Sequence, residues 1–343
     1  MRPRSYLFIL IALILLGVGL FVLRSKNQQA ANQNVLPSFA IENPDDVTLI
    51  FMTNQAGDKQ IYLKKQSDGT WTVNDSFVAS QSKVRFLLEE TMSNLHTDGP
   101  APKAAFDNII SYMSINGIKV EAYTGGDQPE MVYIIGNTTP NQLGTYYKKP
   151  GDETPYIVDL QGFNGFLNVR YELEEDRWIS RTVFSSIKEQ IDSVSVEYPE
   201  ASRSFKMIQP ESGTFVTASE IIKENNKNTG AIRSYFTLFE KLNFETFVFT
   251  ESDSLYNALT TAQPFCTITV NSKNRGKDEL KFFKKDAYEK MHGLYDENGN
   301  PLVNDPSRYY ALYNKLNRVL IVQDYTFGKV MKEAKDFTNR IEM

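Results

Sequence analysis

The feature that most constrains the fold is one order of sequence blocks that occurs twice. Each half has an alternating apolar–polar stretch, a hairpin pattern with a Gly turn, a helical stripe, a second alternating stretch and a returning strand. The first-half blocks are Asp45–Phe51, Ile61–Leu63 with Gly69–Trp71, Val84–Leu95, Ile118–Ala122 and Val132–Ile134. The second-half blocks are Asp192–Tyr198, Phe205–Met207 with Gly213–Phe215, Ile232–Leu242, Cys266–Val270 and Lys281–Phe283. The blocks predict a tandem repeat; chance similarity of generic patterns is the alternative.

These blocks predict two similar α+β modules of mostly antiparallel sheet with packed helices. The offset between matching blocks runs from 144 (Ile61 to Phe205) to 149 (Val132 to Lys281), as a duplicated unit requires. The length of 343 residues also suits two domains of roughly 150 residues each. The sequence places module 1 at residues 37–186 and module 2, a divergent copy, at residues 187–343. Strands outnumber helices in both, which is typical of α+β domains.

The N-terminus predicts a membrane anchor. Residues 6–23 hold eighteen residues without a charge, and at 1.5 Å per residue a helix of that length spans roughly 27 Å, enough for a hydrocarbon core. We expect residues 1–5 in the cytoplasm, a transmembrane signal anchor over 6–23 and a polar stalk over 24–36. A cleaved signal peptide is the alternative, but its apolar core is usually shorter and ends in a small-x-small site. The anchor places the body in the periplasm, on the inner membrane of a bacterium.

Composition excludes several function classes. The net charge of −5 lacks the basic footprint of a nucleic-acid binder. One cysteine and two histidines disfavour a metal centre, and no phosphate-binding glycine motif or G-x-S-x-G nucleophile elbow occurs. His96 follows Leu95 at an expected helix end, where a structural role is the simpler interpretation. Cys266 lies in an apolar strand, which predicts a buried, inert thiol. We therefore expect no enzyme activity, no cofactor and no metal.

Two segments are candidate partner-binding sites. The first is a loop with two glycines among aromatic residues, which gives the candidates Phe163, Asn164 and Phe166. Local packing is the alternative for this loop. The second is an acidic run that gives Glu174, Glu175 and Asp176. It is compatible with a solvated connector between the modules, with a surface that meets a basic partner, and with a carboxylate-dependent hydrolase.

The first module resembles a bacterial envelope family. The residues that carry the resemblance are Gly117–Tyr123, Gly144–Tyr146, Pro155–Val158, Gly162–Leu167, Arg170-Tyr171, Trp178 and Val183-Phe184. In order and spacing they are similar to the family catalogued as domain of unknown function 4340, common in Bacteroidota, with the second module as a looser tandem copy. The usual Trp-Arg is replaced here by Trp178-Ile179. The resemblance implies an anchored or exported envelope protein and an accessory role beside export or gliding-type machinery, and it transfers no catalytic residues.

The sequence thus predicts a single-pass inner-membrane protein with a tandem periplasmic body. We expect it to act as an accessory or scaffold subunit of a larger envelope assembly, with the membrane and other envelope proteins as partners. The alternative is a periplasmic ligand-binding module for a glycan, a peptide or a cell-wall polymer.

Overall fold

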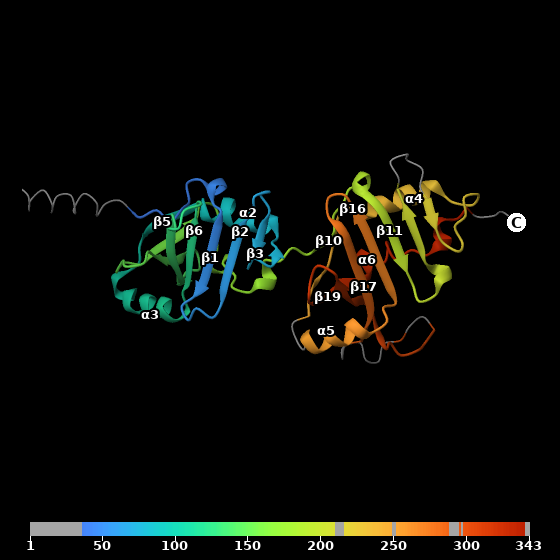
Figure 1. Cartoon of the computed structure of the whole chain (residues 1–343). Helices are drawn as coiled ribbons and strands as arrows, with labels where there is room; N and C mark the ends of the chain where they lie inside the picture. Colours follow the sequence, from blue (N-terminus) through green and yellow to red (C-terminus); the bar gives the residue numbers. More distant parts are fainter. Residues whose placement is uncertain (1–35, 210–215, 249–251, 288–294, 296–297, 340–343) are drawn as a thin grey trace, which may run out of the picture. The chain divides into compact units, whose positions relative to one another are not determined.

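The computed structural model describes residues 36–209, 216–248, 252–287, 295 and 298–339 (Figure 1). The chain divides into two compact units at the bond between Ile179 and Ser180. The predicted anchor over residues 6–23 lies outside the described residues, as do residues 1–5 and nearly all of the stalk. No helix in the described ranges has the length and apolar character needed to cross a membrane.

Unit 1 is built on a nine-stranded sheet with the order β4-β3-β2-β1-β6-β7-β8-β9-β5. The strands are β1 (Leu49–Asn54), β2 (Gln60–Lys65), β3 (Trp71–Val73), β4 (Phe77–Val78), β5 (Leu95–Pro100), β6 (Ile118–Tyr123), β7 (Met131–Thr138), β8 (Thr145–Lys148) and β9 (Tyr156–Leu160). The longer helical segments are α2 (Gln81–Leu87), η2 (Leu88–Met92) and α3 (Phe106–Asn116). Shorter 3₁₀ turns include η1 (Pro44–Asp46), η3 (Lys103–Ala105), η4 (Asn168–Arg170) and η5 (Glu175–Arg177).

Unit 2 carries an eight-stranded sheet with the order β13-β12-β11-β16-β17-β18-β19-β15. Its strands are β11 (Ile191–Glu197), β12 (Phe205–Ile208), β13 (Val216–Ala218), β15 (Thr246–Phe247), β16 (Cys266–Ser272), β17 (Gly276–Asp286), β18 (Asn304–Tyr313) and β19 (Val319–Gln323). A two-stranded ribbon pairs β10 (Thr182–Phe184) with β14 (Leu242–Asn243). Its helices are α4 (Thr229–Phe236), α5 (Ser252–Thr261) and α6 (Asp324–Phe327), and its 3₁₀ turns are η6 (Lys188–Gln190), η7 (Ala201–Arg203), η8 (Thr237–Phe239) and η10 (Ala334–Phe337).

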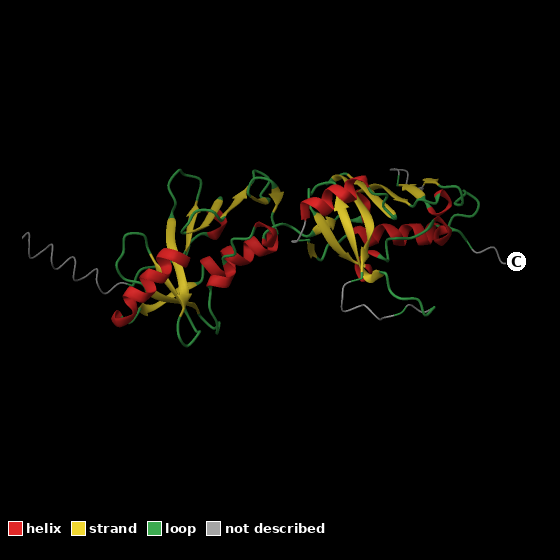
Figure 2. Cartoon of the chain, turned by 90° about the horizontal axis from the view of Figure 1, so that it is seen from below, coloured by secondary structure: helices red, strands yellow, loops and turns green. Residues whose placement is uncertain are grey.

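The strand order is the same in both units once β4 is set aside. In each, a hairpin leads through a helix to a far edge strand, and a second helix then returns the chain to the strand beside the first. Neighbouring strands are antiparallel, and helices lie against the strands of each unit (Figure 2). The α+β class with mostly antiparallel sheet is therefore confirmed.

The strand register corrects the first repeated block. Ile50 pairs with Leu63 and Ala122, and Val194 pairs with Met207 and Val270. Ile50 thus corresponds to Val194, an offset of 144 rather than the 147 of the matched blocks. The sequence match failed because residues 44–46 form the turn η1 instead of the start of a strand. A slip of three residues would place every side chain of β1 on the wrong face of the sheet.

Aromatic side chains fill the core on one face of the unit 1 sheet. Phe39 packs edge-on against Tyr133 and Tyr147, with ring centroids 6.1 and 5.5 Å apart. The hydroxyls of Tyr133 and Tyr171 lie 3.1 Å apart and share a hydrogen bond. Trp178 is fully buried and donates from its indole N–H to the carbonyl of Glu172 at 2.8 Å. The hydroxyls of Tyr133 and Tyr171 and the indole N–H of Trp178 thus find partners, as buried polar atoms usually do, whereas the buried hydroxyl of Tyr147 has none among the described residues.

Helix α3 covers the opposite face of the same sheet. Its residues Ile109 and Met113 pack with Tyr146 in a buried cluster. Gly136 on β7 makes this close approach possible, because a Cβ there would lie 2.8 Å from the end of the Met113 side chain.

Unit 2 fills the corresponding space from different elements. Tyr235 of α4 packs on Phe205 of β12, with ring centroids 5.8 Å apart. Phe327 of α6 packs on Phe282 of β17 at 5.7 Å. Cys266 on β16 is fully buried, and burial raises the pKa of its thiol to about 12. The predicted burial of this thiol is thus confirmed, and its inertness stays a prediction that the raised pKa supports.

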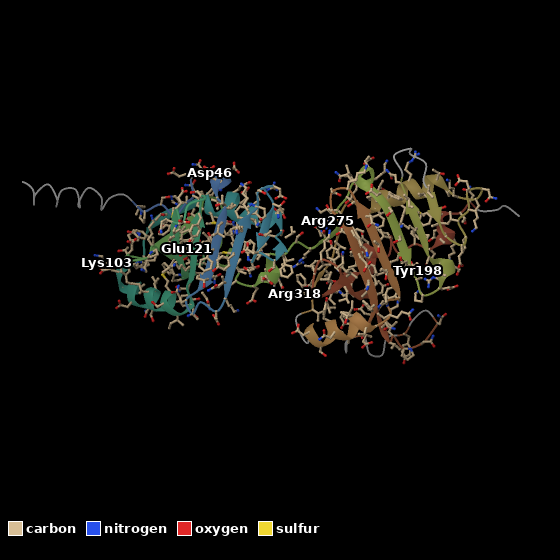
Figure 3. The ribbon with its side chains drawn as sticks, in the orientation of Figure 1. Asp46, Lys103, Glu121, Tyr198, Arg275 and Arg318 are labelled. Atoms are coloured by element: carbon tan, nitrogen blue, oxygen red, sulfur yellow. The ribbon has the colours of Figure 1, made fainter. Side chains whose placement is uncertain are left out.

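Unit 2 also buries the carboxylate of Asp278, which is 1% exposed and lies at the centre of a cluster of charged side chains. Its carboxylate accepts from Arg275 Nε at 2.9 Å, lies 2.7 Å from Lys315 Nζ and accepts a short hydrogen bond from Tyr313. Arg275, which is labelled in Figure 3, also donates to the carbonyl of Val183 at 3.2 Å, and this bond ties β10 to the sheet. A buried carboxylate is tolerated here because cations and a hydroxyl surround it.

Two sequence-based boundaries need correction. The units meet at 179/180 rather than 186/187, because β10 pairs with β14 and Phe184 packs on Phe239, 5.4 Å between ring centroids. The predicted helix over 84–95 is also too long: it ends at Met92 after a π-helical turn, and Leu95 and His96 belong to β5. His96 is therefore a strand residue, not a helix terminus. The predicted turn of the second hairpin, Gly213–Phe215, lies outside the described residues. The two strands on either side of it, β12 and β13, do pair.

Candidate functional site

The glycine–aromatic loop after β9 forms one wall of a pocket in unit 1. Gly162, with φ +79°, turns the chain, and the Phe163 N–H donates to the carbonyl of Leu160 at 2.9 Å. The Phe163 ring then folds back over Gly165, where a Cβ would lie 2.8 Å from the ring. Each glycine thus has a structural reason: one for a left-handed turn, the other for space under the ring. Asn164 lies exposed beside Phe163, and Phe166 is half-buried.

The guanidinium of Arg170 is the centre of this pocket. Its carbon lies 4.5 Å from the centroid of Phe163 and 4.8 Å from that of Phe86, so two rings hold the cation. Phe86 is 46% and Phe163 39% exposed, which leaves both rings accessible from the pocket. Arginine stacks on aromatic faces more readily than lysine because its cation is planar and weakly hydrated.

A π-helical turn fixes the position of this guanidinium. Thr91, buried in η2, accepts from Arg170 Nη1 at 2.9 Å and donates to the carbonyl of Phe86 at 3.2 Å. The same hydroxyl therefore links the arginine to the helix that carries one of its two rings. π-helical turns occur frequently at functional sites. These two hydrogen bonds fix the guanidinium of Arg170 against the helix.

The pocket has a volume of about 560 Å³ and is open to solvent. Its polar lining includes His96, whose Nδ1 lies 3.0 Å from Asp159 Oδ1 on the paired strand β9. At the end of η2 the hydroxyl of Ser93 donates to the carbonyl of Glu89 at 2.6 Å. The lining residues are Phe86, Glu90, Ser93, Asn94, Leu95, His96, Leu160, Gln161, Gly162, Phe163 and Arg170.

Arg170 has no acidic partner within the described ranges of the chain. The salt bridges found there join other cations, and the contacts of Arg170 are those to Thr91, Phe86 and Phe163. An arginine with five N–H donors thus commits one of them to a protein acceptor. The site offers a cation in an aromatic frame, which suits recognition of an anionic group.

The acidic run lies elsewhere on unit 1. Glu174 pairs with Lys59 at 2.6 Å, and Glu175 accepts from Asn74 Nδ2 at 2.8 Å. Asp176 lies beside them in the turn η5. None of the three lines the Arg170 pocket. The run is not a connector between the units, because it precedes their boundary and is bonded to Lys59, which precedes β2, and to Asn74, which follows β3.

Sequence reasoning found one wall of the pocket and missed its centre. Phe163 was a candidate, whereas Arg170 entered only through the family resemblance and Phe86 only as part of a helix. The available signal was a lone arginine that closely follows a glycine–aromatic loop, since arginine and aromatic residues are enriched in binding hot spots. No group of three or more potential metal ligands is clustered among the described residues.

Comparison with protein-family models, with curated proteins and with solved structures finds no match to this chain. The resemblance to domain of unknown function 4340 therefore stays a prediction.

Proposed function

We propose that this chain is a non-enzymatic accessory or scaffold subunit of a cell-envelope assembly, which docks a partner protein through the Arg170 pocket of unit 1. In this proposal the residues 6–23 anchor the chain in the inner membrane, and the body is a tandem pair of copies of one α+β module. The shared strand order of the two units supports the duplication. The family resemblance supports the envelope location.

The single observation that supports the docking role is the guanidinium of Arg170, which is held by two rings and Thr91 and forms no salt bridge with a described residue. Its two rings, Phe86 and Phe163, are large apolar side chains left exposed where most aromatic side chains of unit 1 are buried or half-buried. Interface hot spots are enriched in arginine and aromatic residues, set where water is excluded on binding. The pocket residues would supply such an anchor point for a partner side chain or chain end.

The test is site-specific photo-crosslinking in membranes of the source cells. A photoreactive residue replaces Asn164, at the pocket, or Ile115, an equally accessible position on α3 that is 70% exposed. We expect one membrane or envelope protein to crosslink at Asn164 and not at Ile115, and Arg170→Gln to reduce that crosslink. After mild-detergent extraction the same protein should co-purify in stoichiometric amount. A chain that purifies alone and crosslinks to no protein at either position contradicts the proposal.

The second candidate is a periplasmic module for a small ligand such as a glycan, a peptide or a cell-wall fragment. The open pocket of about 560 Å³ favours it, because this volume lies in the range of ligand sites. A thermal-shift screen with cell-wall fragments and glycans tests it, and the absence of any shift argues against it.

A further inference from the structure

We propose that the Arg170 pocket recognises a carboxylate of a peptide, next to an apolar or aromatic group; this rests on the docking role proposed above. The geometry of the guanidinium is the first argument. Its carbon lies 4.8 Å from the ring centroid of Phe86 and 4.5 Å from that of Phe163, and Thr91 takes one N–H of Nη1. The other four N–H groups of the guanidinium are left to donate to a ligand. A carboxylate is the planar acceptor that matches this fork with two parallel bonds.

The charges around the pocket select a single negative charge over two. Glu90 lines the pocket, and Asp159 lies behind its lining residue His96. Glu89, which precedes Glu90 on the same turn, pairs with Arg85 at 4.0 Å. Attraction to Arg170 and repulsion by Glu90 and Asp159 both scale with the charge of the ligand, so the two acids around the one cation penalise a phosphate dianion more than a carboxylate. Glu90 also offers an acceptor for a backbone N–H of a peptide, which a bare inorganic anion lacks.

The apolar lining argues for a carbon body beside the acid. Leu95 and Leu160 form a cross-strand pair at the pocket wall, and the rings of Phe86 and Phe163 flank the cation. A carboxylate that carries an aromatic or aliphatic side chain covers this lining while it pairs with Arg170. The same chemistry arises from a chain-terminal carboxylate and from an internal acidic side chain beside an apolar residue.

In the experiment the purified full-length chain, in detergent, is titrated with each probe, and binding is measured by saturation-transfer NMR of the probe. The first pair of probes is N-acetyl-alanyl-phenylalanine with a free carboxylate and its C-terminal amide. An amidated peptide with glutamate in place of alanine tests an internal acid, and phenyl phosphate tests a dianion. We expect at least one of the two acids to bind tenfold or more tightly than the neutral amide, and phenyl phosphate to bind more weakly than that acid.

Variants connect this preference to Arg170. Arg170→Gln should remove the tenfold advantage of the acid, and Arg170→Lys, which keeps the charge and loses the fork, should keep only part of it. Arg177→Gln is the matched control: Arg177 is an exposed arginine of unit 1 outside the pocket, and this change should leave binding unaltered. Tryptophan fluorescence, which reports on unit 1 alone, checks that each variant is folded.

Four outcomes overturn the inference: equal binding of acid and amide, tighter binding of phenyl phosphate, acid binding that survives Arg170→Gln, or no binding of any probe at millimolar concentration. The crosslink at Asn164 separates this failure from failure of the docking role. If that crosslink persists and depends on Arg170 while the acids fail, the carboxylate assignment is wrong and docking stands. If the crosslink is absent as well, both are wrong.

Discussion

The two units share a strand order but fill it with different side chains. By register, Tyr133 of unit 1 corresponds to Leu280 of unit 2, and Tyr147 to Ala311, since each stands across from equivalent partners. Unit 1 closes its tyrosine core with Phe39, whereas unit 2 has smaller residues in the sheet and brings Phe327 from α6.

The two units also differ in where they place their buried polar side chains. The buried Asp278, at the centre of the charge cluster of unit 2, corresponds by register to Met131 of unit 1. Unit 1 instead places its tyrosine hydroxyl pair in the core and its acid-free arginine at the surface pocket. The comparison teaches that alternating strands fix the topology, while the interior and the surface loops change independently.

The chain carries a natural probe for each unit. Both tryptophans, Trp71 and Trp178, belong to unit 1, and the single cysteine, Cys266, belongs to unit 2. Burial raises the pKa of the Cys266 thiol to about 12, so the native thiol should react slowly with 4,4′-dithiodipyridine and quickly after unfolding. Tryptophan emission and thiol reactivity in urea thus follow the two units separately.

Trp178→Ala should produce the largest difference between the units. The indole is fully buried, its N–H is bonded to Glu172, and Lys83 Nζ lies 4.6 Å from its ring. Removing a buried aromatic of this size costs about 4 kcal/mol. We expect the urea midpoint of unit 1, followed by Trp71 emission, to fall sharply while the protection of Cys266 is unchanged. If Trp71 emission and Cys266 protection were lost in one transition, the two units would not unfold separately.

Asp278→Ala should destabilise unit 2 and leave unit 1 unchanged. The substitution leaves the partly buried guanidinium of Arg275 without its carboxylate, and breaking such a pair costs about 3 kcal/mol. Unit 2 should expose Cys266 at lower urea, and the tryptophan transition of unit 1 should stay in place. Met131→Ala is the control at the corresponding, half-buried position and should cost less. A similar cost at both positions would mean that the charge cluster adds little to unit 2.

Much of the architecture was predictable because it rests on local patterns. The strands over 118–122 and 266–270 were found from their alternation, and β6 and β16 contain them in full. The hairpin turn at Gly69 was found from a glycine that indeed takes φ +83°. The α+β class follows from these elements together with their helices.

The rest depends on contacts that no local pattern encodes. The extra turn at residues 44–46 shifted the first repeat block, because an Asp-Asp pair reads equally well as the start of a strand or as a turn. The pocket joins Phe86, Thr91, Phe163 and Arg170 from three separate segments. Only a tertiary structure brings such residues together, so sequence reasoning could identify the Phe163 loop but not the arginine it holds.

Acid should weaken unit 2 through Glu245. Arg308 donates to its two oxygens at 2.8 and 3.0 Å, and these bonds hold the pKa of Glu245 below its usual value near 4.5. A lowered folded pKa means that the stabilisation is complete above the unfolded pKa and is lost as pH falls through the folded one. We expect Glu245→Gln to cost about 1 kcal/mol at neutral pH and progressively less as the pH falls toward 3.

The measurement is the urea midpoint of Cys266 exposure from neutral pH to pH 3, since 4,4′-dithiodipyridine also reacts in acid. Glu240→Gln, at an exposed acid of the same unit, is the matched control and should show no such convergence. A cost for Glu245→Gln that is constant across this pH range would assign the loss to packing instead of charge.

The smallest expected difference concerns how two corresponding helices begin. Asn228 caps α4 with a side-chain oxygen that accepts from the Ala231 N–H at 3.0 Å, whereas Ser80 precedes α2 without a side-chain cap bond. Asn228→Ala should therefore cost unit 2 about 1 kcal/mol, and Ser80→Ala should change unit 1 by less than about 0.5 kcal/mol. Asn228→Asp, which keeps the acceptor, should restore most of the loss. Equal costs for both alanine variants would mean that the start of α2 depends on its serine after all. The backbone indicates otherwise, because the Ser80 N–H is held by the carbonyl of Trp178 at 2.7 Å, a bond that Ser80→Ala leaves intact.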